Sequence, residues 1–578
     1  MSAGRRVIAY GDAAAIVIPG PHEDRRRLAE WLVTRASDAV CDVVVGIEVV
    51  VVVWEAGRLD ASTIEAWLED IGPDPSEPAG TFPAPRARTV AVPVAFGGPD
   101  TELVCATTGV GPDELAELLM SARLEVAAVG FSPGFAYLVG VPAPLDRVAR
   151  LARPRTSVPA GSVALAGGMA AVYPQATPGG WSLIGMSPMP MFDATAPPYA
   201  LLAPGDEVRF VRAAGSVGGA APPGDPVPPA SRRPVAPAPI HPALVIGDPG
   251  FQSMVQDAGR QGVAGAGVPR GGPADPVAFH LANRLVGNRA GAGAVEMAVR
   301  GARWTAWRDL QIAVVGPGTS VAVDGRQVGS GHLVPVSAGQ VVEVGSIGRA
   351  GTGLRAYLAA HGGLDVPTAF ASRSTDALSW LGPGLLRPGD EIGLAHDALG
   401  VPADRLSLPA AALVEGGGQL DAGGAGARPG AKSAPRVLRV LAGPHLDALG
   451  PGALRQLVAG RWMVEPTSDR VGVRLRDGGG PIERRPGEIR SLGMVEGAVQ
   501  VPPDGMPVVL GRDHATLGGY PVVAVVIAAD RHVLGQCRPG EALSFELVDL
   551  AHAAAALHAV VALLDSGVVG RYPSVAGG

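Results

Sequence analysis

The chain has 578 residues and a formal net charge of -7, with 47% hydrophobic and 17% charged residues. This composition supports packed cores and excludes disorder over most of the length, and the negative charge argues against nucleic-acid binding by bulk charge. The 82 glycines and 55 prolines indicate many turns between short strands.

The first 82 residues predict a small α+β module, with helices over Arg25–Thr34 and Thr63–Asp70 and a strongly apolar strand over Val43–Trp54. Residues 83–213 predict a second module of short strands separated by turns, with one helix at Pro112–Ala122. The strands expected in this module are Thr89–Phe96, Val126–Val129, Ser162–Ala166, Trp181–Ile184 and Glu207–Val211.

Two changes in composition divide the rest of the chain. Residues 214–242 are rich in proline and predict an extended linker, and residues 415–435 are rich in glycine and alanine and predict a flexible connector. These segments bound two further modules, 243–414 and 436–578, the last of which ends in a helix over Leu550–Leu564.

A repeated element relates the modules to one another. A Pro-Gly-acid turn followed by an alternating strand ends at Phe210, at Leu394 and at Phe545. A second element, Thr-x-Gly-Gly-aromatic, precedes the first and the last of these turns. We infer three related β-rich modules, each a closed or partly closed barrel, although Pro-Gly-acid is also a common turn in unrelated proteins.

The near absence of lysine excludes several mechanisms. Lys432 is the only lysine, and its context fits neither a phosphate-binding P-loop nor a biotin-attachment turn nor a Schiff-base site. Any phosphate or carboxylate must therefore be bound by arginine, by backbone N–H groups or by a metal.

The positions of the cysteines and the lengths of the apolar runs bear on where in the cell the protein is expected. Cys41, Cys105 and Cys537 are scattered without a C-x-x-C motif, which fits a reducing environment. The first residues lack the apolar run of a secretory signal, and the longer apolar runs are too short to span a bilayer. We expect a soluble cytoplasmic protein.

The first half contains two candidate sites. In GFSPGFAYL, the turn at Gly134 is flanked by aromatic residues, including Phe135, and would let a ligand approach the backbone; packing on the core is an equally good interpretation. In RPRTSVPAGSVALAGG, Arg153 and Arg155 lie on one face of an extended segment before the turn at Gly161, an arrangement that suits an anion but is also common on solvated surfaces.

The second half contains further polar clusters. Glu296 would be a carboxylate in an apolar strand and should have a partner or a raised pKa. Asp275 precedes a proline and is sufficiently explained as a helix N-cap. The remaining candidates combine amides, hydroxyls, arginines and acids in short motifs, which suit phosphate or acid–base chemistry but also occur in plain turns: Gln256, Asp257, Arg260, Asn283, Arg373, Ser374, Asp469, Arg470, Gln500, Asp513, His514, Thr516 and Tyr520. We also expect Arg470 and Arg474 to share a face.

Together these motifs resemble a known family. Residues 1–213, through GFSPGFAYL, RPRTSVPAGSVALAGG and YPQATPGGW, resemble allophanate-hydrolase subunit 1 proteins, which include the B subunit of bacterial 5-oxoprolinase. Residues 243–548, through VQDAGRQGVAGAGVPRGGPAD, LANRLVGN and SDRVGVRL, resemble subunit 2 proteins, which include the C subunit. A similar pair forms the carboxyltransferase region of urea carboxylase, so the chain looks like a B–C fusion.

The resemblance implies a mainly β fold with α+β parts: a small α+β N-terminal module and three cyclophilin-like β-barrel modules. It implies ATP-dependent activation of 5-oxoproline for ring opening to glutamate, with ATP and Mg²⁺ as cofactors and a separate A subunit as partner. Two alternatives remain: a carboxyltransferase for urea or a related amide with its biotin carrier in trans, and a non-catalytic regulator of a sensor kinase.

The site residues carried over are hypotheses. Glu296, Asp513, His514 and Asp257 are the catalytic candidates, and Gln175 and Thr177 join the substrate- or nucleotide-binding residues named above. We expect no residue to serve as a resident metal ligand. Three positions depart from the family pattern and put the substrate in question: Met120 replaces a histidine, Met186 replaces an arginine, and Ala515 replaces a glutamine.

Overall fold

The computed structural model describes residues 5–20, 24–35, 38–69, 88–213, 242–348, 353–395, 406–407, 435–487, 489–565 and 570–571. These residues are mainly strands with short helices, which confirms the expected fold class. The predicted linker, 214–242, and the predicted connector, 415–435, lie almost entirely outside the described residues.

The N-terminal module is a four-stranded antiparallel sheet in the order β1-β2-β4-β3 with two helices. Its elements are β1 (Arg6–Ala9), β2 (Ala14–Ile18), α1 (Arg25–Arg35), β3 (Val40–Val45), β4 (Val50–Trp54) and α2 (Ala61–Glu69). Both predicted helices are confirmed to within two residues. The single strand predicted over Val43–Trp54 is wrong: a turn closed by the Gly46 N–H and the Val49 carbonyl, 2.7 Å apart, splits it into the hairpin β3–β4.

The second module is a closed seven-stranded barrel in the order β10-β7-β6-β13-β5-β12-β9. The strands are β5 (Thr89–Phe96), β6 (Leu124–Val129), β7 (Ala136–Val139), β9 (Ser162–Ala166), β10 (Met169–Val172), β12 (Ser182–Met186) and β13 (Glu207–Arg212). Outside it lie α3 (Thr101–Thr108), α4 (Pro112–Ser121) and the pair β8 (Arg155–Val158) and β11 (Thr177–Gly179). The predicted strands and the helix at Pro112 are all present.

The middle module consists of two sheets rather than one closed barrel. The seven-stranded sheet contains β14 (Leu244–Asp248), β17 (Arg303–Ala306), β19 (Val321–Val323), β20 (Arg326–Gln327), β22 (Val341–Val344), β24 (Leu364–Asp365) and β25 (Glu391–Leu394). The five-stranded sheet contains β15 (Gln252–Gln256), β16 (Ala294–Ala298), β18 (Leu310–Val315), β21 (Leu333–Val336) and β23 (Arg355–Ala360). Trp304, Ile312 and Leu358 share the core between these sheets, and α5 (Pro276–Leu285) covers the outside.

The last module is again a closed seven-stranded barrel, in the order β27-β34-β31-β32-β29-β28-β35. Its strands are β27 (Arg436–Ala442), β28 (Trp462–Val464), β29 (Gly472–Asp477), β31 (Ala498–Gln500), β32 (Val508–Leu510), β34 (Val522–Val526) and β35 (Ala542–Leu547). It carries the pair β30 (Leu492–Gly493) and β33 (Leu517–Gly518), and the helices α7 (Ala453–Ala459), α8 (Arg531–Gly535) and α9 (Leu550–Asp565). A further short pair, β26 (Leu406–Ser407) and β36 (Gly570–Arg571), lies apart from it. The predicted C-terminal helix corresponds to α9.

The repeated Pro-Gly-acid element has the same structural position in the two closed barrels. The strand after it, β13 or β35, runs parallel to the first strand of its own barrel, β5 or β27. In the middle module the corresponding strand, β25, pairs with the first strand β14 in the antiparallel sense. In all three modules the strand after the repeat therefore pairs with the module's first strand, and this pairing is antiparallel in the middle module, which is not a closed barrel.

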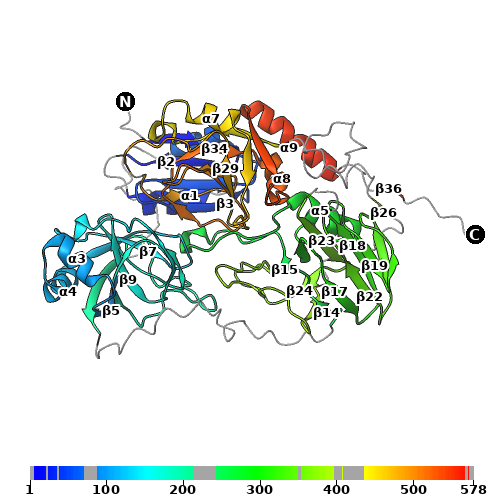
Figure 1. Cartoon of the computed structure of the whole chain (residues 1–578), viewed down its shortest axis with the longest axis horizontal. Helices are drawn as coiled ribbons and strands as arrows, with labels where there is room; N and C mark the ends of the chain where they lie inside the picture. The colour runs from blue at the N-terminus through cyan, green and yellow to red at the C-terminus, as the bar shows by residue number, and fades with distance from the viewer. Residues whose placement is uncertain are drawn as a thin grey trace, which may run out of the picture.

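The N-terminal module packs against the last barrel, at the opposite end of the sequence (Figure 1). Tyr10, Ile16 and Val51 share one buried cluster with Leu492 and Val525. The loop GFSPGFAYL, residues 130–138 of the second module, also contacts the C-terminal half of the chain, because Leu517 is buried against Phe135 and Tyr137. The two halves therefore form a continuous packed body. None of the helices among the described residues is long and apolar enough to cross a membrane.

Candidate functional site

A buried ionic network joins the middle module to the last barrel. Glu296, at the centre of β16, is 2% exposed, and its Oε1 lies 2.5 Å from Nη1 of Arg470. Arg470 in turn contacts Asp513 through two hydrogen bonds of 2.6 and 2.9 Å, in the bidentate geometry that suits guanidinium and carboxylate. The structure thus brings together three residues that the sequence placed in separate motifs.

The prediction that Glu296 would have a partner is confirmed. Its Oε2 accepts hydrogen bonds from the Tyr357 hydroxyl at 2.8 Å and from the Ala274 backbone N–H at 2.9 Å, and Nε of Arg355 lies 3.3 Å from Oε1. Burial alone would raise the pKa of Glu296, but the charges of Arg470 and Arg355 outweigh it and lower the pKa below its ordinary value. Glu296 is therefore a fixed anion, which fits a structural or electrostatic role better than that of a general acid.

Arg470 has a partner at each of its guanidinium nitrogens, since its Nη2 also donates to the Gly272 carbonyl at 2.6 Å. Burial would lower the pKa of Arg470, but Asp513 and Glu296 raise it well above its ordinary value. The expectation that Arg470 and Arg474 share a face is wrong: Arg470 precedes β29 and is buried, whereas Arg474 lies within that strand and is exposed.

Asp275 is the N-cap of α5, as predicted. Its side chain accepts from the Ala278 N–H at 2.9 Å, and Nε2 of Gln536 donates to its other oxygen at 2.6 Å. Gln536, which sequence reasoning missed, also accepts from the backbone N–H groups of Leu354 and Arg355 at 2.8 Å each. Burial raises the pKa of Asp275. The pair Asp275–Gln536 thus ties the start of α5 and of β23 to the last barrel.

Asp257 organises the loop that contains Ser372, Arg373 and Ser374. Its carboxylate accepts from the hydroxyls of Ser372 and Ser374, both at 2.6 Å, and from the Arg373 backbone N–H at 2.6 Å. The Arg373 side chain points to Asp365, 3.0 Å away. Because these groups saturate Asp257, its contacts support a role in loop positioning rather than in proton transfer.

Beside this loop lie three buried side chains with incomplete hydrogen bonding among the described residues. Gln256 donates to the Thr375 carbonyl at 2.9 Å, and Arg260 donates to the carbonyls of Ser374 and Ala369, but Oε1 of Gln256 and Nη1 of Arg260 have no partner. Oδ2 of Asp376 also has none. Burial, and next the charge of Asp513, raise the pKa of Asp376 to about 6. Asp376 was not among the predicted site residues, although it directly follows the Ser-Arg-Ser-Thr motif.

Asn283 lies in the interior of α5 and is saturated by structural contacts. Its amide donates to the Ala292 carbonyl at 3.0 Å and accepts from Asn288 at 2.9 Å, while Asn288 binds the Gly362 N–H and the Ala360 carbonyl, both at 2.8 Å. This amide pair clamps the end of α5 to β23. The clamp accounts for Asn283 without a ligand.

The glycine-rich turn of the second module contacts protein rather than an open space. The Gly134 N–H donates to the Ala266 carbonyl at 2.9 Å, and a Cβ at Gly134 would lie 2.7 Å from the Met191 carbonyl oxygen. Phe135 is 2% exposed and stacks edge-on with Tyr137, Tyr173 and Trp181. Of the two interpretations of this motif, the packed core is the one its contacts support.

Arg153, Arg155 and Gly161 lie apart from the ionic network. Arg155 makes an ion pair of 2.6 Å with Asp100, whose other oxygen accepts from the Leu183 N–H at 2.7 Å, and Arg153 is exposed. Gly161 has a positive φ of 83° and no room for a Cβ beside the Ser187 carbonyl. Gln175 and Thr177, in the same module, each have a buried polar atom without a hydrogen-bond partner among the described residues. Nothing here joins Arg153 or Arg155 to the second-half residues.

The remaining candidates surround the turn before β34. His514 is half-buried, with Nδ1 2.9 Å from the Ala515 carbonyl oxygen, and its partial burial lowers its pKa. Gln500 contacts the sulfur of Met494 at 3.0 Å, and the Tyr520 ring lies 5.9 Å from the Arg484 guanidinium. The Thr516 hydroxyl is buried without a partner among the described residues. Of this motif only Asp513 joins the ionic network.

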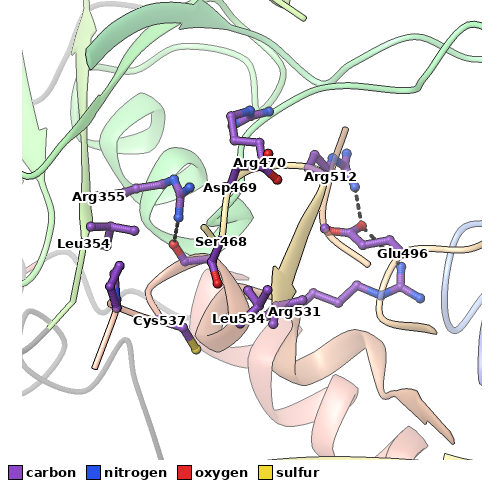
Figure 2. A pocket seen from close by; sticks show the side chains of 15 residues that line it. Leu354, Arg355, Ser468, Asp469, Arg470, Glu496, Arg512, Arg531, Leu534 and Cys537 are labelled. Carbon is purple, nitrogen blue, oxygen red and sulfur yellow. Dashed lines mark hydrogen bonds and ion pairs between the residues drawn. The ribbon is translucent and has the colours of Figure 1, made fainter. Parts of the chain in front are cut away.

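A small pocket opens beside the network, between the middle module and the last barrel (Figure 2). Four arginines line it, namely Arg355, Arg470, Arg512 and Arg531, together with Asp469 and Glu496. Arg512 binds Glu496 at 2.7 Å and the Gly271 carbonyl at 2.6 Å. Burial would raise the pKa of Glu496, but Arg512 and Arg531 lower it to about 2. Sequence reasoning did not select Arg355, Arg512, Arg531 or Glu496, because nothing in the sequence indicates that they lie close together.

Comparison with known proteins places this architecture in a family. The profile of the carboxyltransferase domain, subdomain A and B, matches residues 266–547, and that of subdomain C and D matches residues 8–202. The chain is 32% identical to the 5-oxoprolinase C subunit of Escherichia coli (strain K12) over 301 residues, which cover 51% of this chain and 88% of that protein. The chain therefore belongs to the carboxyltransferase-domain family. Within it, the chain is a fusion of a region like the 5-oxoprolinase B subunit with a region like the C subunit.

Other known proteins are similar to the first half, to about half of the chain, or to nearly the whole chain. The chain is 45% identical to the 5-oxoprolinase B subunit of Escherichia coli O157:H7 over 130 residues, or 22% of this chain and 59% of that protein. It is 31% identical to urea amidolyase of Lachancea kluyveri over 52% of this chain but only 17% of that protein. The solved structure of TTHA0988 has a TM-score of 0.75 and 32% identity, and the match covers 94% of this chain and 100% of that chain. The expected family resemblance is thereby confirmed.

Proposed function

We propose that this chain activates 5-oxoproline for ring opening to glutamate, using ATP, and that a separate A subunit completes the hydrolysis. The similarity of its first half to the B subunit and of its second half to the C subunit, in one polypeptide, carries this proposal. The two halves also pack on each other through buried residues, so a site that needs both would be assembled within one chain.

The chemistry follows from the stability of amides. A lactam carbonyl is a poor electrophile, and transfer of the ATP γ-phosphoryl group to its oxygen, with release of ADP, converts that oxygen into part of a leaving group. Water then adds to the activated carbon, and cleavage of the C–N bond frees the amine and leaves an acyl phosphate. A second water hydrolyses the acyl phosphate, which releases inorganic phosphate and gives the carboxylate of glutamate. The protein must neutralise the phosphoryl oxygens without lysine, which leaves arginines and backbone N–H groups.

The described residues fit such a role in part. Arg355, Arg512 and Arg531 line one pocket beside the fixed pair Arg470–Glu296, and guanidinium groups are donors suited to phosphoryl oxygens. No cluster of three or more His, Cys, Asp or Glu side chains in the described part of the chain has the arrangement of a metal site. In this proposal Mg²⁺ therefore enters with the nucleotide.

The test is ATP turnover by the purified chain. ADP release should depend on 5-oxoproline, and glutamate should form only when the A subunit is added. Glutamate offered in place of 5-oxoproline is the control substrate and should give no ADP above background. Absence of 5-oxoproline-dependent ADP, with and without the A subunit, would refute the proposal.

A second candidate is a carboxyltransferase acting on urea or a related amide. The carboxyltransferase-domain profiles and the similarity to urea amidolyase favour it. Because the chain's one lysine lacks the context of a biotin-attachment turn, the biotin carrier would be a separate protein. A streptavidin blot of the proteins that co-purify with the chain distinguishes the two candidate functions. A biotinylated partner supports transfer of a carboxyl group, and the absence of such a partner supports activation of the lactam.

A further inference from the structure

The pocket in Figure 2 has features of a binding site that the motifs did not indicate. Its wall is built from distant segments: Arg355 begins β23 of the middle module, Arg470 and Arg512 flank strands of the last barrel, and Arg531 begins α8. The contacts that fix this wall include the Arg355 hydrogen bond to the Gly535 carbonyl and the Arg512 hydrogen bond to the Gly271 carbonyl. Arg355 and Arg512 are thus held in place before any ligand arrives.

One of these arginines has a donor that lacks an acceptor. Nε of Arg531 is buried without a hydrogen-bond partner among the described residues, whereas Nε of Arg355 lies 3.3 Å from Oε1 of Glu296. The carboxylates closest to Arg531 are those of Asp12 and Glu496, each 3.8 Å away, which is beyond hydrogen-bond distance. A guanidinium offers only donors, so what satisfies it must be an acceptor.

The charge around the pocket limits how strongly it binds an anion. Four arginines face two carboxylates in the lining, Asp469 and Glu496. Behind the wall, Glu296, Asp513 and Asp12 compensate Arg355, Arg470 and Arg531. Since the whole cluster is close to neutral, attraction comes from directed hydrogen bonds at short range more than from net charge.

The size of the pocket selects a small ligand. Its volume is about 40 Å³, and a buried water needs roughly 10–15 Å³ by a similar measure, so the pocket has room for about three oxygen-sized atoms. That space suits a single phosphate or carboxylate group and is too small for a nucleoside, since pockets for drug-sized ligands have volumes of roughly 300–1,000 Å³.

We propose that this pocket is a subsite for one small oxyanion, either a phosphate or a carboxylate group, bound chiefly by Arg531 with Arg355 and Arg512. Under the proposed function the occupant is the phosphoryl group or the substrate carboxylate. Oxyanion binding itself needs neither ATP nor the A subunit, so it can be tested even if the proposed function fails.

The experiment measures binding of inorganic phosphate and of acetate to the full chain by calorimetry and by the shift of the thermal unfolding midpoint. Sodium chloride at equal ionic strength is the reference. At least one of the two oxyanions should raise the midpoint above the chloride value. A response to phosphate alone assigns a phosphoryl site, and a response to acetate alone assigns a carboxylate site.

Three variants separate the pocket from general effects. Arg531→Gln should weaken oxyanion binding at least tenfold. Arg300→Gln, which changes an exposed arginine of the middle module paired with Asp248, should leave it unchanged. Asp469→Asn removes a negative charge from the pocket rim while keeping an oxygen to accept from the Val471 and Gly472 N–H groups, so it should tighten binding several-fold.

These outcomes decide the matter even if Arg531→Gln proves unstable, because Asp469→Asn tests the same pocket in the opposite direction. The proposal is overturned if neither oxyanion acts beyond chloride, in which case water alone occupies the pocket. It is equally overturned if both pocket variants bind as the unmodified chain does. If the unmodified chain binds phosphate but shows no 5-oxoproline-dependent ATP turnover, the result counts against the proposed function and not against the oxyanion subsite.

Discussion

Nη1 of Arg470 lies 2.5 Å from Oε1 of Glu296, although the two residues are 174 positions apart and belong to different modules. This contact is the centre of the candidate site, because Arg470 also neutralises Asp513.

Removal of Arg470 should strongly destabilise the chain. Arg470→Met leaves Glu296 and Asp513 buried without their shared partner, and breaking a buried pair in this way costs about 3–5 kcal/mol. The free energy of unfolding in urea measures the effect. The control, Arg474→Met, changes an exposed arginine in the adjacent strand and should alter stability by less than about 0.5 kcal/mol. Equal effects of the two substitutions would show that the network contributes nothing specific.

Stability should fall in acid through Glu496. Its pKa is about 2 in the folded chain, against an ordinary value of 4.5. A lowered folded pKa adds stability above the ordinary pKa, and this is lost as pH falls from about 4.5 through 2. At about 1.4 kcal/mol per pKa unit the contribution is about 3 kcal/mol.

The measurement is the free energy of unfolding as a function of pH. Glu496→Gln should lower stability at neutral pH and flatten the profile between about pH 4.5 and 2. Glu117→Gln, at an exposed position on α4, is the control and should leave the profile unchanged. An unaltered slope in Glu496→Gln would mean that its ion pairs with Arg512 and Arg531 do not stabilise the fold.

Substitution of Gly535 should disturb the contact between α8 and α5. A Cβ at Gly535 would overlap the Ala274 carbonyl oxygen and lie 2.5 Å from its carbon, and backbone atoms cannot give way as a side chain can. Gly535→Ala should therefore cost about 1–3 kcal/mol of stability. Gly111→Ala, where a Cβ meets nothing within 4 Å, is the matched control. A tolerated Gly535→Ala, measured by thermal unfolding, would contradict this packing.

Leu517 should be important for the contact between the halves. It belongs to the second half but is 1% exposed in a cluster with Val44, Phe135 and Tyr137 of the first half. Leu517→Ala should cost about 2–5 kcal/mol through the cavity it leaves. Leu378→Ala, at a side chain that is 52% exposed, should have little effect. A comparable loss of unfolding free energy in both variants would argue against the shared core.

The fold was predictable where local signals agree with tertiary structure. Helices α1, α4 and α9 form where the residue composition favours a helix, and Asp275 with Pro276 marks the start of α5, where Asp275 is the N-cap. The hairpin within 43–54 was missed because the run is apolar apart from Gly46 and Glu48, and these two residues do not form a recognised turn pair. Which of the three modules is open was not predicted, because a repeated turn does not specify how its strand pairs.

The candidate site was predictable only in part. Glu296 stood out as a charge in an apolar strand, and Asp513 and Arg470 lay in motifs, but nothing in the sequence indicates that they meet. Arg355, Arg512 and Arg531 were not selected, because their proximity depends on how two modules pack. Asp257 and Asn283 were selected because they lie in polar motifs, but their partners are the chain's own loop and helix end.

The packing of the N-terminal sheet on the last barrel has a consequence for how the chain is held together. Because the beginning of the polypeptide completes the core near its end, severing the backbone between residues 213 and 242 should leave two fragments that remain bound. The covalent link between the halves then adds little to the strength of their association. It ensures instead that the two halves are produced in equal amounts, because both are synthesised in one polypeptide.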